Sequence, residues 1–247
     1  MANNIHPTAI IEKGAIIGDN NTIFENVIIR KNVIIGNNNH IGPNSLLENI
    51  VNVGNSNKIY GFISIGTLGE MGLKGDTLPN NSEVFIGNNN VFREFITINF
   101  PVRKKKTLIL NNCYFMARTH IPHDVHIGNN VVMATNSLIG GGCELNDYVY
   151  VGLNAHIHQW LNIGEGSLLG MSSATITNVP PFLIVVGIPS KIIKVNEEGL
   201  KRRNFSHNQI SIFKKYISGE ITEEIVDNEL IIKHRKFINN HDDYLGK

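Results

Sequence analysis

The sequence predicts an all-β solenoid, a left-handed parallel β-helix of hexapeptide repeats, followed by a C-terminal α-helical domain. Two observations carry this prediction. An aliphatic residue recurs at every sixth position from Ile5 to Ile65, a spacing that neither an amphipathic helix nor an alternating strand produces. Small, polar and turn-forming residues fill the positions between, as in Ile35-Gly36-Asn37-Asn38. Each six-residue unit therefore corresponds to one short strand and one corner.

The short repeat also determines how the units pack. A single unit cannot bury its apolar side alone, so it must stack on its neighbours. Three such strands close one triangular coil, and successive coils rise by about 4.8 Å, the strand spacing of a sheet. Gly and Asn supply corner conformations that other residues adopt only at a cost in free energy.

Length and composition exclude several classes of protein. The chain has 247 residues, enough for a solenoid with an appended module. A net charge of +1 gives no reason to expect a nucleic acid or a membrane surface as partner. No secretory h-region follows Met1 and no apolar run would span a bilayer, so we expect a cytoplasmic protein. Cys113 and Cys143 lack the spacing of a metal site, and we expect both to be reduced and structural.

The β-helix is predicted over residues 1–190, with two interruptions at about 67–83 and 99–108. The repeat resumes in a new phase after each one, at Ile86 and at Ile109. Insertions in a solenoid must leave the coil as loops, which often carry binding residues, although loops without function are the alternative. The second loop contains the basic run from Arg103 to Lys106, which suits phosphates or an acidic partner, or is a solvated charge run.

Residues 191–247 are predicted to form the helical domain. The repeat ends near Thr175, and Val179-Pro180-Pro181 marks the exit from the coil. Ser206 and Gln209 form a capping box that opens a helix, and Thr222 is predicted to cap a second helix. Helices at this end would cover the open edge of the solenoid.

The densest cluster of chemically active residues surrounds His123. A lone His is more often structural, but His123 is followed by Asp124 between two loops, and an imidazole beside a carboxylate can serve as a general base. Gly141 lies one coil of eighteen residues later, where its backbone N–H can stabilise an oxyanion. A tight corner that needs glycine is a compatible explanation. The basic segment from Lys201 to Arg203 suits a diphosphate or a phosphorylated carrier, or is a plain basic turn.

Zinc is the competing use of several histidines, since β-helical carbonic anhydrases bind zinc between subunits through His ligands. Here His156 and His158 lie two coils from His123, and no comparable His and Glu arrangement is evident. We therefore predict no metal site. A zinc-dependent hydratase and a non-catalytic solenoid scaffold remain as alternatives from other classes.

Five segments form a pattern that covers nearly the whole chain: Ile5 to Ile10, Arg118 to Asp124, His158 to Trp160, Val179 to Phe182 and Glu198 to Phe205. The His-Pro-Thr-Ala motif of the first is common among hexapeptide proteins. The His-x-x-His-Asp motif together with Gly-Leu-Lys-Arg-Arg is specific. The pattern resembles the UDP-N-acetylglucosamine acyltransferases of lipid A biosynthesis.

This resemblance implies a homotrimer with active sites in the clefts between subunits. It makes His123 the general base, Asp124 its support and the Gly141 amide the oxyanion donor. It implies no permanently bound cofactor, and an acyl-CoA or an acyl carrier protein thioester as co-substrate of a nucleotide sugar. The other implied site residues are His120 and His158 in the acceptor pocket, Gln159 and Met171 along the acyl chain, and Asn196, Glu198, Arg202 and Arg203 at the nucleotide diphosphate or the donor.

The sequence also departs from the family pattern. Gly72 replaces an acidic residue that contacts the acceptor sugar, with Glu70 or Asp76 as substitutes, and Gly142 replaces a His. The segment 99–102 replaces His-Arg-Gly-Thr. Because the base and the oxyanion donor are kept while sugar-facing positions differ, we expect acyl transfer to the amine of a nucleotide-linked amino sugar. The alternative is the acyl carrier protein-dependent O-acyltransferase of lipid A biosynthesis.

Overall fold

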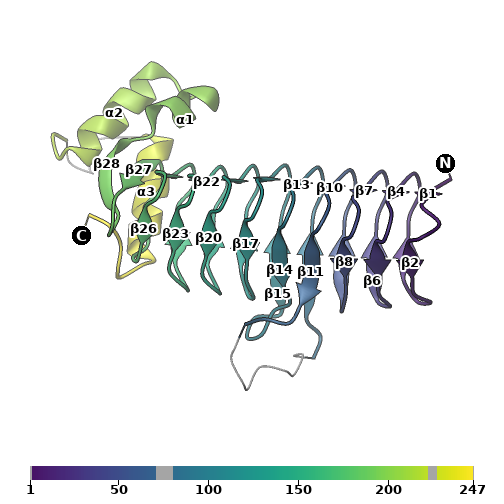
Figure 1. The fold of residues 1–247 in the computed structure, drawn as a ribbon. Coiled ribbons are helices and arrows are strands. Elements are labelled where there is room, and N and C mark those ends of the chain that lie inside the picture. The colour runs from purple at the N-terminus through teal and green to yellow at the C-terminus, as the bar shows by residue number, and fades with distance from the viewer. Residues whose placement is uncertain (1, 71–79, 222–226, 247) are drawn as a thin grey trace.

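The computed structural model describes residues 2–70, 80–221 and 227–246. The chain forms a three-sided, left-handed parallel β-helix with helices packed at its C-terminal end (Figure 1). The first sheet contains β1(Asn4–Ile5), β4(Thr22–Ile23), β7(His40–Ile41), β10(Lys58–Ile59), β13(Val91–Phe92), β16(Tyr114–Phe115), β19(Val132–Met133), β22(Tyr150–Val151), β25(Leu168–Leu169), β27(Leu183–Val186) and β28(Lys191–Val195).

The other two sheets complete the prism. The second sheet contains β2(Ile10–Ile11), β5(Ile28–Ile29), β8(Leu46–Leu47), β11(Ser64–Thr67), β14(Thr97–Asn99), β17(His120–Ile121), β20(Leu138–Ile139), β23(His156–Ile157) and β26(Ala174–Thr175). The third sheet contains β3(Ile16–Ile17), β6(Val33–Ile35), β9(Val51–Val53), β12(Glu83–Ile86), β15(Lys106–Ile109), β18(His126–Ile127), β21(Glu144–Leu145) and β24(Asn162–Ile163).

The six-residue period predicts the core correctly. The strands from β1 to β26 pair in parallel with the strands one coil away, so that Ile23 lies beside Ile41 and Ile41 beside Ile59. The side chains of all three are at most 1% exposed, because they point to the axis of the prism. The corners take left-handed backbone conformations, as at Asn20 (φ 58°) and Asn38 (φ 59°), which Asn tolerates better than most residues.

A ladder of buried asparagines runs along one edge of the N-terminal half. The side chain of Asn39 donates to the Gly54 carbonyl at 2.9 Å, and its own oxygen accepts from the backbone N–H of Asn57 at 2.9 Å. The same pattern links Asn21 to Asn39 and Asn57 to Asn90. Buried amides are costly unless they are hydrogen-bonded, and here each corner satisfies the next.

Both interruptions of the repeat leave the coil between the second and third sheets (Figure 1). The first follows β11, and its residues 71–79, which include Gly72 and Asp76, lie outside the described residues. The second connects β14 to β15. Despite both loops, the register of the third sheet is regained, because Val84 pairs with Val51 on one side and Thr107 on the other.

The C-terminal end contains more strand than the sequence predicts. After β26 the chain forms β27, parallel to β25, and then turns back as β28, antiparallel to β27. The helices α1(Glu197–Arg202), α2(His207–Ile217) and α3(Glu229–Asn239) follow. The capping box of Ser206 and Gln209 is confirmed at α2. For α3 the described cap is Asn228 rather than the predicted Thr222, which lies outside the described residues.

A second apolar cluster attaches these helices to the solenoid. Its buried members are Phe182, Leu183, Val195, Leu200, Ile210, Phe213, Leu230 and Ile231. Glu165 of the last full coils accepts from the Lys233 ammonium of α3 at 3.1 Å and pairs with the Arg203 guanidinium. No helix within the described ranges is long and apolar enough to cross a membrane.

Acidification should destabilise the helical end through His234. This side chain is 7% exposed between the rings of Phe213 and Tyr216, and burial lowers its pKa to about 4. Between about pH 6.5 and pH 4, His234 is therefore protonated in the unfolded chain but neutral in the folded chain. The free energy of unfolding falls by about 3 kcal/mol as the pH drops through this window.

A His234→Phe variant should lose that part of the pH dependence. Denaturant midpoints followed by the helical circular dichroism signal at pH 7 and pH 4 provide the measurement. The exposed His207→Gln variant serves as the control and should keep the wild-type slope. Equal slopes for wild type and His234→Phe would show that another group causes the acid sensitivity.

Candidate active site

His123 and Asp124 form a buried pair at the edge between the second and third sheets. The edge follows β17 and precedes β18, and Asp124 adopts a left-handed conformation (φ 66°) that turns its carboxylate back to the preceding imidazole. His123 Nδ1 lies 2.8 Å from Asp124 Oδ2. An ionised carboxylate only accepts hydrogen bonds, so in the neutral imidazole Nδ1 carries the proton and Nε2 has the free lone pair.

The second loop surrounds Asp124 with donors. The backbone N–H groups of Val102, Arg103 and Lys104 donate to its oxygens at 2.9, 3.0 and 2.7 Å. Burial by itself would raise the pKa of this fully buried carboxyl group, but the hydrogen bonds from His123 and from the loop amides outweigh it and hold the pKa below its usual range. Asp124 therefore remains a carboxylate that fixes the orientation of His123.

Gly141 lies directly over the imidazole, one coil later. A Cβ atom at Gly141 would stand 2.6 Å from His123 Cε1 and 2.8 Å from Nε2, so only glycine fits there. The next amide, that of Gly142, donates to the His123 carbonyl at 3.0 Å and fixes the two coils relative to each other. The predicted closeness of His123 and Gly141 is thus observed in the structure.

His120 lies beside this pair on the outer face of the second sheet. Its Nδ1 is 2.6 Å from the Thr97 hydroxyl. Burial lowers the pKa of His120, while the negative charge of Glu70 opposes that shift and nearby His123 adds to it. Glu70 and His123 thus both lie close enough to His120 to affect its pKa, and Glu70 is one of the acidic groups expected at the acceptor.

The coil above adds exposed side chains to the same edge. Gln159 follows Gly141 by one further coil, with its backbone close enough that a Cβ at Gly140 would meet Gln159 N at 2.4 Å. His158 and Gln159 are both exposed. Trp160 lies over Gly142, whose Cβ would stand 2.1 Å from the indole ring. Trp160 thus occupies the space beside Gly142, where the family pattern has a His.

The predicted nucleotide residues gather at a different edge, between the third and first sheets. Asn196, Glu198, Arg202 and Arg203 line a cavity of about 500 Å³ together with Tyr148, Tyr150 and Leu168. Glu198 and Arg202 are exposed at its rim. This cluster and His123 belong to separate edges of one prism, so a single chain does not bring them together.

Two members of this cluster have hydrogen-bond partners in the solenoid. Asn196 caps α1, accepting from the Gly199 N–H at 3.1 Å and donating to the Gly166 carbonyl at 2.9 Å. The Arg203 guanidinium pairs with Glu165 and stacks 4.2 Å from the centre of the Tyr148 ring. Both residues therefore shape the cavity wall.

Met171 lies at the third edge, between the first and second sheets, and its side chain is 74% exposed. The whole of the second sheet separates this edge from that of His123 within one chain. A role for Met171 in limiting acyl length therefore requires a groove across that sheet or a second copy of the chain.

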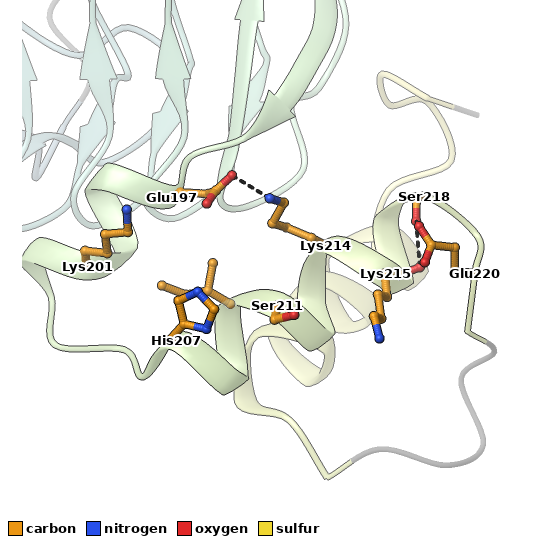
Figure 2. Close-up of a pocket in the computed structure, with 9 residues that line it drawn as sticks. Glu197, Lys201, His207, Ser211, Lys214, Lys215, Ser218 and Glu220 are labelled. Atoms are coloured by element: carbon orange, nitrogen blue, oxygen red, sulfur yellow. Dashed lines mark hydrogen bonds and ion pairs between the residues drawn. The ribbon is translucent and has the colours of Figure 1, made fainter.

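The helical end carries another cavity, of about 370 Å³, between α1 and α2. Figure 2 shows the side chains around it, including Lys201, Lys214, Lys215 and His207. Lys214 is paired with Glu197 at 2.9 Å, while Lys201 pairs with Glu198 at the rim at 2.9 Å. Among the described residues, no group of three His, Cys, Asp or Glu side chains is placed to hold a metal ion.

Comparison with known sequences places the chain in a family. The family model described as "Bacterial transferase hexapeptide (six repeats)" matches residues 14–49 and 106–141, and "Udp N-acetylglucosamine O-acyltransferase; Domain 2" matches residues 178–218. A protein of Burkholderia orbicola named acyl-(acyl-carrier-protein)--UDP-N-acetylglucosamine O-acyltransferase is 42% identical over 85% of this chain and 80% of its own length. The chain belongs to the UDP-N-acetylglucosamine acyltransferase family.

Further relatives agree with this assignment. The protein of the same name from Aliarcobacter butzleri is 40% identical over 92% of this chain and 90% of its own length. The solved UDP-N-acetylglucosamine acyltransferase of Campylobacter jejuni superimposes with a TM-score of 0.90 at 28% identity, covering 98% of both chains. The predicted family, the left-handed β-helix and the acyltransferase activity are confirmed. Because the relatives are named O-acyltransferases, they favour the alternative over the N-acylation that we expected first.

Several residues that build the site were not singled out from the sequence. Thr97 fixes His120, and the Thr107 hydroxyl accepts from the Asp124 amide at 3.0 Å. Gly69 packs its backbone on His123, since a Cβ there would stand 2.9 Å from His123 Cβ. Arg103 and Lys104 of the basic run bind Asp124 through their backbone amides. Gly69 in the first loop was the one sign in the sequence that this loop packs on the site, because backbone that packs closely against a side chain requires glycine.

Proposed function

We propose that this family member transfers an acyl group from an acyl carrier protein thioester to a hydroxyl group of UDP-N-acetylglucosamine. The observation that carries the proposal is the stacking of Gly141 on an imidazole whose other nitrogen is bound to Asp124. The names of the relatives support the acceptor and the carrier. A hydroxyl acceptor thus replaces the amine acceptor that we expected first from the sequence.

The proposed chemistry uses the free nitrogen of His123. Nε2 removes the proton of the attacking hydroxyl as its oxygen adds to the thioester carbonyl, and Asp124 stabilises the resulting imidazolium. The Gly141 N–H donates to the oxyanion of the tetrahedral intermediate. Collapse of the intermediate breaks the C–S bond, and the imidazolium returns the proton to the thiolate. The products are an ester and a free thiol, with no net change in protons.

The proposal includes a homotrimer. His123, the Arg202 cavity and Met171 lie on three different edges of one prism, so parallel packing of prisms would bring edges of different subunits together. In that arrangement Glu198 and Arg202 of one subunit would bind the nucleotide diphosphate near His123 of the next. His120, His158 and Glu70 would surround the sugar, and Gln159 and Met171 would contact the acyl chain.

The charges at the helical end support a carrier protein as donor. Lys201, Lys214 and Lys215 are exposed and line the cavity shown in Figure 2. Clustered exposed cations favour an acidic protein surface and speed its association at low salt.

A crossed substrate experiment tests the proposal. Purified protein is incubated with UDP-N-acetylglucosamine or a UDP-linked amino sugar, each with an acyl carrier protein thioester or the matching acyl-CoA, and products are identified by mass. We expect an ester of UDP-N-acetylglucosamine with the carrier protein thioester. Exclusive acylation of the amino sugar would restore the N-acyl alternative, and no transfer with any pair would overturn both. A hydratase activity that chelation abolishes would instead support the zinc alternative.

A further inference from the structure

Lys104 contacts the candidate site in two separate ways. Its backbone N–H donates to Asp124 Oδ1 at 2.7 Å. Its ammonium donates to the Gly142 carbonyl at 3.2 Å and to Glu144 Oε1 at 2.9 Å. One residue thus binds the carboxylate that orients His123 and the carbonyl group of Gly142, the residue after Gly141.

These contacts close a ring. Lys104 holds Asp124, whose neighbour His123 accepts at its carbonyl from the Gly142 N–H at 3.0 Å, and the Gly142 carbonyl returns to the Lys104 ammonium. Three links of the ring are hydrogen bonds from an N–H donor to an oxygen acceptor, and the others are covalent bonds of the chain. A closed ring restricts the distance between the imidazole and the Gly141 amide more strongly than any single link does.

Trp160 covers the Gly141–Gly142 segment from the coil above. Its N–H donates to the Gly141 carbonyl at 2.9 Å, and its ring lies against Gly142 with the Lys104 ammonium 5.9 Å from the ring centre. The Lys104 side chain is only 25% exposed, so its contacts are shielded from solvent more than those of a surface lysine. The Asn162 side chain donates to the other oxygen of Glu144 at 3.2 Å and so helps to orient the carboxylate that pairs with Lys104.

Among the described residues, the side chains of the other basic residues in the loop form no hydrogen bond with Asp124 or Gly142. Lys106 pairs with Glu83 at 2.6 Å on the outer face of the third sheet. Arg103 is exposed, with its guanidinium 5.6 Å from the Trp160 ring centre, and Lys105 is exposed beside it. The sequence suggests that the basic run either contacts phosphates or an acidic partner or is a solvated charge run. It contains one residue, Lys104, that is built into the candidate site.

We propose that Lys104 is a positioning residue that holds the His123–Asp124 pair and the Gly141 amide in one arrangement, an inference that rests on the proposed function. It touches no substrate atom. Its ammonium acts through the Gly142 peptide and its backbone through Asp124. Loss of the ammonium opens the ring at one link while the backbone amide remains in place.

The test compares Lys104→Met with Lys104→Arg and with the matched control Lys105→Met. For Lys104→Met we expect kcat to fall about 10- to 100-fold, with KM for both substrates within about twofold of wild type. Lys104→Arg keeps a charged donor and should recover most of the lost kcat. Lys105→Met removes the same charge next door and should match wild type.

Several outcomes would overturn the inference. They are an unchanged kcat in Lys104→Met, an equal loss in Lys105→Met, or a loss confined to KM, which would indicate a carrier contact instead. If Lys104→Met does not fold, Glu144→Gln provides the second measurement, because it weakens the hold on the ammonium and should lower kcat in the same direction with KM unchanged. Wild-type turnover is measured first, so that an inactive wild type reports failure of the proposed function and not of the role of Lys104.

Discussion

Replacement of His123 by Ala should lower kcat by about three orders of magnitude, the scale of a lost general base. The substitution removes Nε2, the proposed proton acceptor, while Asp124 keeps its hydrogen bonds from the loop amides. The remaining activity would come from substrate binding and the Gly141 amide. Product formation with the acyl carrier protein thioester and UDP-N-acetylglucosamine, measured at saturating substrate, gives the value.

The control for this variant is His126→Ala. His126 is three residues away, half-buried on β18, and its Nε2 has no hydrogen-bond partner among the described residues. Its loss should leave kcat within a few-fold of wild type. If His123→Ala also kept its activity within tenfold, His123 would not be the base, and the scaffold alternative would regain support.

The fold could be predicted from the sequence because the hexapeptide period is a property of single residues. An axis-pointing apolar residue such as Ile29 or Ile41 recurs from strand to strand, and these two are fully buried. The hairpin of β27 and β28 was missed for the same reason. Its strands pair outside the eighteen-residue repeat, and Leu183 packs on the helices rather than on the axis.

The site was predictable where it follows the repeat and not where it depends on loops. His123 and Gly141 differ by one coil, so their contact follows from counting residues. The amides that bind Asp124 belong to the second loop, whose path does not follow the hexapeptide repeat. Every residue except proline has a backbone N–H, so the residue types do not show which amides bind a carboxylate. Asn196 and Arg203 show the opposite problem, because a cap and a polar recognition residue look alike in sequence. Their contacts with Gly166 and Glu165 are visible only in the structure.

A Gly141→Ala variant should lose about two to three orders of magnitude in kcat, the scale reported by removal of an oxyanion donor. The added methyl would stand 2.6 Å from His123 Cε1, well inside van der Waals contact, so either the imidazole or the peptide must move. Movement of the peptide misdirects the Gly141 N–H, and movement of the ring separates Nε2 from the attacking hydroxyl. Both displacements act on the transition state, so KM should change little.

The matched control separates this effect from simple steric strain. Gly128→Ala introduces a methyl at a similar distance, 2.5 Å, from Asp147 Oδ1 at a corner between the third and first sheets. Both variants should lower the melting temperature, because both disturb the stacking of adjacent coils, but Gly128→Ala should keep most of the wild-type kcat. Equal losses of kcat would mean that any disturbed corner impairs turnover. In that case the contact between Gly141 and His123 would be a packing feature of the prism, and the oxyanion donor would have to be sought elsewhere along the edge.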